Sequence, residues 1–188
     1  MDFMDSNLEG ILDRCLAAFV GAGTLDLSLD KLAAGVGVSK RMLIHYFGGK
    51  AAIEELATER LEERLRAQFR VDAFPPGTSL ADVVLALWER TTRPESRGVL
   101  LLVMDLNRRA WNSSQAGSDR ARAFYLEQQR LWVDLLLEFS PDRELVESVL
   151  QLFQGLVLAF LVSGDADRGR KALERYLSIV ERHDRAEI

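Results

Sequence analysis

The stretch SLDKLAAGVGVSKRMLIHYFGGK, residues 28–50, decides the fold of this chain. Ser28 is a favourable N-cap for a short helix, and Gly37 suits a turn in which a positive φ costs little. Ser39 then caps a second short helix, which Gly48 ends. Two short helices joined by a tight turn predict a helix-turn-helix.

The second of these helices is expected to expose cations on one side. At about 100° per residue, Leu43 and Phe47 lie together and face the core, whereas Arg41 and His45 point away from it. Lys40 lies in the first turn, where free backbone N–H groups attract anions. Such a helix fits the major groove of DNA. The alternative is a tight helical hairpin with a solvated basic edge, because short patterns of this kind also occur by chance.

Composition predicts a globular protein. The 188 residues are 48% hydrophobic and 28% charged, and the single cysteine, Cys15, excludes an internal disulfide framework. The formal net charge of −5 argues against indiscriminate nucleic-acid binding but allows a local basic surface.

No targeting or membrane segment is expected. Residues 1–9 are acidic and lack the apolar core of a signal peptide. The apolar run 149–162 is short for a membrane span and contains two glutamines, so we expect a buried helix there. These features predict a cytoplasmic protein with no membrane partner.

The sequence indicates no catalytic or metal site. Two histidines and one cysteine are too few for a metal-ligand cluster, and no phosphate-binding loop of the form GxxxxGK[ST] occurs. No Ser–His–Asp arrangement is indicated either. We therefore expect a protein that is not an enzyme and that uses no metal or cofactor.

Helical periodicity extends along the whole chain, and no convincing strand pattern interrupts it. The segments 74–77 (FPPG) and 112–118 are clear breaks. Pro141, after Ser140, is expected to open an eighth helix at 141–163, which a ninth at 166–183 follows. The prediction is an all-α fold of about nine helices.

The stretch from Ile11 to Ile53, ILDRCLAAFVGAGTLDLSLDKLAAGVGVSKRMLIHYFGGKAAI, resembles the N-terminal domain of the TetR family of transcriptional regulators. The family pattern has a Ser or Thr before the second helix, Ala-x-x-x-Gly-Val-Ser before the recognition helix, and an aromatic-rich end followed by Lys. The matching positions are Ser28, Ala33, Gly37, Val38, Ser39, Leu43, Phe47 and Lys50. The resemblance implies a three-helix DNA-binding domain over 1–50 and a helical effector-binding and dimerisation domain over 51–188.

Three positions depart from the family pattern. Ile44 stands where the family often has a Tyr that touches a DNA phosphate, so Tyr46 or His45 is expected to supply that contact. Arg41 and Met42 replace small residues and would project towards the bases, Arg41 towards a guanine. His45 can instead be a neutral surface residue. The implied DNA-binding residues are Ser28, Ser39, His45, Tyr46 and Lys50 for the backbone, and Lys40, Arg41 and Met42 for the bases.

The resemblance also implies a dimeric repressor that a small apolar or aromatic effector releases from a palindromic operator on double-stranded DNA. The helices at 141–163 and 166–183 would pair with those of a second copy, the alternative being packing within one chain. An effector pocket would use apolar and aromatic side chains that could equally form an ordinary core: Trp88, Met104, Trp111, Phe124, Trp132 and Phe153. The alternative function is a helical interaction module that does not bind DNA specifically.

Overall fold

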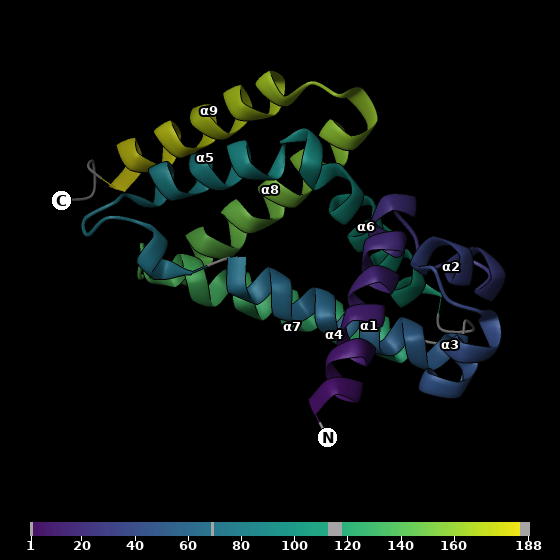
Figure 1. The fold of residues 1–188 in the computed structure, drawn as a ribbon. Helices are drawn as coiled ribbons and strands as arrows, with labels where there is room; N and C mark the ends of the chain where they lie inside the picture. The colour runs from purple at the N-terminus through teal and green to yellow at the C-terminus, as the bar shows by residue number, and fades with distance from the viewer. Residues whose placement is uncertain (1, 69, 113–117, 185–188) are drawn as a thin grey trace. The chain divides into compact units, whose positions relative to one another are not determined.

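The computed structural model describes residues 2–68, 70–112 and 118–184, and the side chains of 7–68, 70–112 and 119–180. Within these residues the chain forms nine α-helices and no strand, which confirms the all-α prediction (Figure 1). The helices are α1 (Asp2–Ala22), α2 (Leu29–Val36), α3 (Lys40–Phe47), α4 (Lys50–Gln68), α5 (Leu80–Thr91), α6 (Arg97–Trp111), α7 (Ser118–Leu137), α8 (Arg143–Ser163) and α9 (Ala166–Asp184). Two short 3-10 helices, Val71–Ala73 and Pro94–Ser96, lie before and after α5.

The helices belong to two compact units. The first contains α1 to α4, α6 from Gly98 onwards, and α7 up to Gln129. The second contains α5, the rest of α7, α8 and α9. This division by compactness differs from the predicted boundary after residue 50. That boundary concerns the end of the DNA-binding domain and stays a prediction.

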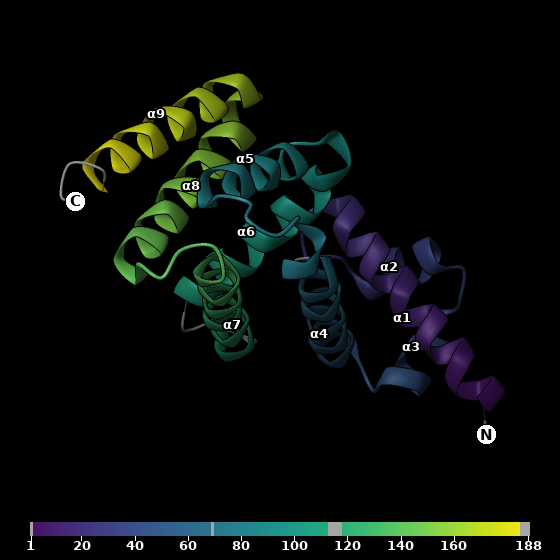
Figure 2. The ribbon, with the colours of Figure 1, turned by 90° about the vertical axis from the view of Figure 1, so that its left-hand side faces the viewer.

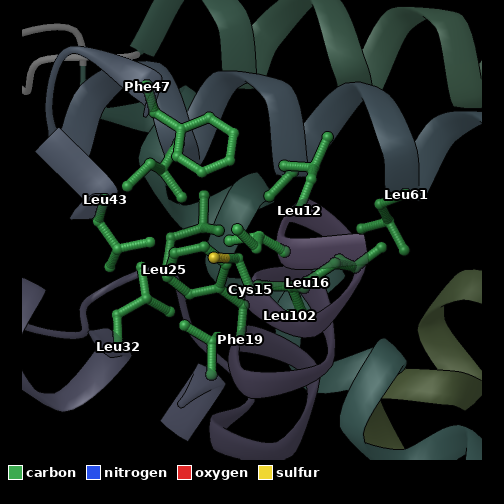
Figure 3. Close-up of a cluster of buried hydrophobic side chains, with 14 of the residues drawn as sticks. Leu12, Cys15, Leu16, Phe19, Leu25, Leu32, Leu43, Phe47, Leu61 and Leu102 are labelled. Carbon is green, nitrogen blue, oxygen red and sulfur yellow. The ribbon is translucent and has the colours of Figure 1, made fainter. Parts of the chain in front are cut away.

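The core of the first unit is built around α1. This helix packs on α2 and α4, and α3 packs on α2 and α4 in turn. Cys15 and Phe19 of α1 meet Leu32 of α2 and Leu43 of α3 in a buried cluster (Figure 3). Burial raises the pKa of the Cys15 thiol to about 11, so Cys15 behaves as a small hydrophobic residue.

The second unit is organised around Trp88 of α5. In this unit α9 packs on both α5 and α8, as Figure 2 shows from the side. The Trp88 ring lies edge-on to Phe153, with centroids 5.6 Å apart, and its Nε1 donates a hydrogen bond of 3.0 Å to the carbonyl oxygen of Ala166. One face of α5, with Val83, Val84 and Leu87 beside Trp88, is buried.

Helix α8 differs from the prediction in two respects. It begins at Arg143 rather than at Pro141, because the Asp142 side chain caps it by accepting a hydrogen bond from the Leu145 N–H at 3.1 Å. Val162 is 84% exposed, so the expectation of a buried helix holds for only one side of α8. Among the described residues it is the one helix long and apolar enough to cross a membrane, a weak indication by length and composition alone.

Candidate DNA-binding site

The segment from Ser28 to Gly48 forms the predicted helix-turn-helix. The Ser28 hydroxyl accepts a hydrogen bond from the Lys31 N–H at 3.2 Å, which caps α2. Gly37 has φ 73°, a left-handed conformation that L-residues with a Cβ rarely adopt, and it ends α2. These features leave only three residues between the end of α2 and the start of α3.

Helix α3 is capped and oriented by its own sequence. The Ser39 hydroxyl accepts a hydrogen bond from the Met42 N–H at 3.2 Å, and Gly48 ends the helix with φ 81°. Leu43 and Phe47 are buried, as their spacing predicts. The outer face is therefore free to meet a partner.

The outer face of α3 carries a mixture of cationic and apolar side chains. Arg41 and His45 are exposed, and Arg41 has no ion-pair partner among the described residues. Met42 and Ile44 are also exposed, Ile44 by 43%. Tyr46 is half-buried and its ring centroid lies 5.5 Å from that of His45. A helix with this surface can offer hydrogen bonds to guanine and apolar contact to thymine methyl groups.

The two lysines of the predicted site have carboxylate partners that spacing in the sequence did not indicate. Lys40 Nζ lies 3.0 Å from Asp30 Oδ2, so α3 and α2 are linked by an exposed ion pair. Lys50 Nζ lies 3.5 Å from Asp26 Oδ1 and 3.2 Å from Glu54 Oε1. Neither lysine is therefore an uncompensated charge.

The connection between α1 and α2 is held by a carboxylate that sequence reasoning missed. Asp105 of α6 accepts hydrogen bonds from Thr24 Oγ1 at 3.0 Å and from the Leu25 N–H at 3.1 Å. Arg108 and Arg109 donate to the same carboxylate at 2.7 and 3.2 Å. No local motif marks Asp105, because Thr24 and Leu25 precede it by 81 and 80 positions.

The environment of Asp105 lowers its pKa. Burial by itself would raise the pKa of this carboxyl. The hydrogen bonds from Arg108, the Leu25 N–H and Thr24, together with the charge of Arg109, outweigh burial and hold the pKa below its usual range. Arg109 also lies 3.2 Å from Glu54, the partner of Lys50. A continuous polar network thus reaches from α6 to the start of α4.

The six aromatic and apolar residues proposed for an effector pocket divide between the two units. Trp88, Trp132 and Phe153 lie in the second unit, where the Trp132 and Phe153 centroids are 6.2 Å apart. Phe124 is fully buried in the core of the first unit. The other two also belong to the first unit: Met104 is half-buried and Trp111 is 86% exposed. The structure therefore does not bring all six together within one unit, and their role as a pocket stays a prediction.

The first unit contains a cavity that none of these six residues lines. Its volume is about 400 Å³, and α4, α6 and α7 contribute most of its wall. Its lining combines apolar side chains such as Leu106 with Arg109 and Arg120, and each arginine is paired with a glutamate of α4. Among the described residues, no three His, Cys, Asp or Glu side chains are grouped in a way that could hold a metal ion.

Comparison with known proteins agrees with this geometry. A family model described as bacterial regulatory proteins, tetR family, matches residues 11–56, which contain α2, α3 and most of α1. The HTH-type transcriptional regulator BetI of Rhizobium meliloti (strain 1021) is 29% identical over 117 residues, or 50% of this chain and 57% of BetI. The chain thus spans little more than half the length of this curated relative.

Solved structures share the fold at low sequence identity. A tetR-family transcriptional regulator from Streptomyces coelicolor has a TM-score of 0.74 at 17% identity, covering 93% of this chain and 80% of that one. A TetR-family regulator from Cytophaga hutchinsonii has a TM-score of 0.67 at 17% identity, covering 95% and 96%. The helix-turn-helix of α2 and α3 thus lies in the stretch that matches the TetR family of bacterial regulatory proteins, and the curated relative that the chain resembles is a transcriptional regulator.

Proposed function

We propose that this protein is a sequence-specific DNA-binding repressor that works as a homodimer and responds to a small molecule. The observation that carries the proposal is the outer face of α3, where Arg41, Met42 and His45 are exposed on a helix whose other side is buried in the core. A helix held in this way can enter a major groove without losing its support.

The proposed contacts with DNA divide into base contacts and phosphate-backbone contacts. Arg41 would bind a guanine edge, and Lys40 and Met42, its neighbours at the start of α3, would also meet the bases. Contacts to the DNA backbone would position the protein without reading the base sequence. They would come from polar side chains around α3: Ser28, Ser39, His45, Tyr46 and Lys50. The Ser28 and Ser39 hydroxyls already accept cap hydrogen bonds, so they would meet a phosphate as donors.

Dimerisation would use α8 and α9. Leu158 and Val162 of α8 are exposed, as is Ile179 of α9. Exposed apolar side chains on two adjacent helices favour burial against a second copy, and a two-fold axis also matches a palindromic site. Gly155 lies on the exposed side of α8 with open space where a Cβ would be, which is compatible with a close approach by another helix.

The effector is proposed to be a small apolar or aromatic molecule, which the protein would bind in the cytoplasm. The support is the family and the apolar, aromatic character of Trp88, Trp132 and Phe153. These side chains pack against one another, so an effector would have to separate them or bind beside them.

The test is selection of bound fragments from random duplex DNA by the full chain, followed by sequencing. We expect a palindromic motif whose half-sites are about 10 base pairs apart, or a multiple of this. Binding should weaken steeply as salt rises, because phosphate contacts release counterions. Recovery of unselected sequence would favour the helical interaction module instead.

A further inference from the structure

Both carboxylates in residues 24–50 lie beside a lysine of the same segment. Asp30 is 3.0 Å from Lys40, and Asp26 is 3.5 Å from Lys50. The same surface leaves Arg41 without an ion-pair partner among the described residues. Lys50 is a proposed phosphate contact. Lys40 was grouped with the base contacts, but it lies in the first turn of α3, where free backbone N–H groups attract anions, so a phosphate is the better partner for it. Acidic side chains are therefore placed next to two lysines that would contact phosphates and not next to the arginine that would read a base.

The fold holds both acids in these positions. Asp30 lies in the first turn of α2, two residues after the Ser28 cap, where free backbone N–H groups also attract anions. Asp26 donates its backbone N–H to Thr24 Oγ1 at 3.0 Å, and Thr24 is in turn bonded to Asp105 of α6. Each acid thus has a defined backbone position close to its lysine.

The ion pairs themselves are weak. The side chains of Lys40 and Asp30 are 48% and 72% exposed, so water and salt screen their attraction. A phosphate can therefore approach Lys40 without first overcoming a strong contact. The carboxylate stays within a few ångströms, however, and its negative charge repels the incoming phosphate.

We propose that Asp26 and Asp30 are affinity-determining residues, which weaken the phosphate contacts of Lys50 and Lys40 and so lower DNA affinity for all sequences alike. The inference rests on the proposed function, since it assumes that these lysines face DNA. Base reading by Arg41 is unaffected, because phosphate contacts carry no sequence information. Affinity for DNA of unrelated sequence, which is almost entirely electrostatic, is lowered as a result.

The test compares Asp30→Asn and Asp26→Asn with the wild-type chain on two duplexes. One duplex is that selected by the wild type from random DNA, and the other is a scrambled sequence of the same length. Each substitution should tighten binding to both duplexes by a similar factor, on the order of threefold to tenfold at about 0.1 M salt. The slope of log K against log salt should steepen by up to about 0.9 for each phosphate contact strengthened.

Two controls separate this effect from a general change of charge. Glu63→Gln removes the same charge from an exposed pair on α4, where Glu63 lies 3.6 Å from Arg60, and should leave binding nearly unchanged. Asp30→Asn should also have a smaller effect when Lys40 is already replaced by Gln, because the acid then has no lysine contact to weaken. Unfolding curves check that each variant remains folded.

The outcomes are distinct. Equal tightening by Asp30→Asn and Glu63→Gln, or a gain that is as large in the Lys40→Gln background as in the wild type, would show that Asp30 acts only through net charge and would overturn the inference. A gain confined to the selected duplex would overturn it too. Failure of the wild type to bind any duplex would instead refute the proposed function, and the inference with it.

Discussion

Arg41 is the residue on which sequence preference should depend most. It is exposed on α3, has no ion-pair partner among the described residues, and can bind guanine through two hydrogen bonds. Arg41→Ala should therefore reduce discrimination at one base position in each half-site by about 1–3 kcal/mol. Gel-shift titrations with single-base variants of the selected duplex measure this directly.

A matched control for this change is Lys31→Ala, which removes a cation from the neighbouring helix α2. It should lower affinity for every duplex by a similar factor without altering the order of preference. An unchanged order of preference in Arg41→Ala would show that another side chain, such as Met42, reads the bases.

A second prediction at the scale of one residue concerns the contribution of Asp105 to stability. Asp105→Asn removes the charge that Arg108 and Arg109 face and weakens the bonds to the α1–α2 connection. The free energy of unfolding at neutral pH should fall by about 1–3 kcal/mol. Urea unfolding measures it. Asp134→Asn, in an exposed pair on α7, should change it by less than about 0.5 kcal/mol.

The pH dependence of this effect has a definite sign. The pKa of Asp105 is lower in the folded protein than the unfolded value of about 3.9. Its charge therefore contributes fully to stability above that unfolded value, and the contribution is lost as the pH falls through the folded pKa. The difference between the wild type and Asp105→Asn should shrink below about pH 4. A difference that stays constant with pH would show that the loss is steric.

At the scale of elements, short helices depend on their neighbours. Helix α3 has eight residues, and an isolated helix shorter than about 12 residues is marginal in water. Its caps, Ser39 and Gly48, set its limits, but Leu43 and Phe47 keep it folded by packing into the core beside α1. The outer face of α3 therefore depends on the core of the first unit for its stability.

Contact between α5 and α9 gives a prediction at this scale. A Cβ on Gly169 would overlap the Trp88 ring, approaching its Cη2 to 2.6 Å, and Trp88 is held by Phe153 and by its hydrogen bond to Ala166. Gly169→Ala should therefore lower the free energy of unfolding by about 1–3 kcal/mol. Thermal unfolding monitored by circular dichroism gives the measurement.

Gly21→Ala in α1 is the control for this substitution, because nothing lies within 4 Å of the added Cβ. It should be neutral or stabilising by up to about 1 kcal/mol, since alanine is the better helix former. Equal effects of the two substitutions would mean that α9 can move away from Trp88 at little cost.

For the whole molecule, the prediction concerns association. Val162→Glu places a charge on the exposed apolar side of α8, one turn from Leu158, and should convert a dimer into a monomer that retains its helix content. Loss of the second subunit's helix-turn-helix should lower operator affinity by about 100-fold or more. Sedimentation equilibrium and DNA titration measure the two effects.

The control for association is Leu126→Glu, which makes the same kind of change at an exposed position on α7. It should leave both the molecular mass and the operator affinity as in the wild type. A wild-type chain that sediments as a monomer, or a Val162→Glu variant that remains a dimer, would refute the assignment of α8 and α9 to the interface.

The sequence by itself determined the features that depend on a few neighbouring residues. The caps at Ser28 and Ser39, the turn at Gly37 and the buried pair Leu43 and Phe47 all follow from short-range hydrogen bonding and helical spacing, and the structure confirms them. The start of α8 is an exception, because the sequence predicts an opening at Ser140-Pro141 and the structure has Asp142 as the N-cap.

Only the tertiary structure decided which distant residues meet. Asp30 and Lys40, which form an ion pair, are ten positions apart in the sequence. Asp105 and Leu25, which form a hydrogen bond, are 80 positions apart. Periodicity assigns a side chain to the inner or outer side of its helix but not to a partner on another helix. For that reason Trp88 and Phe124 were predictable as buried residues, whereas their separation into two units depended on how the helices pack.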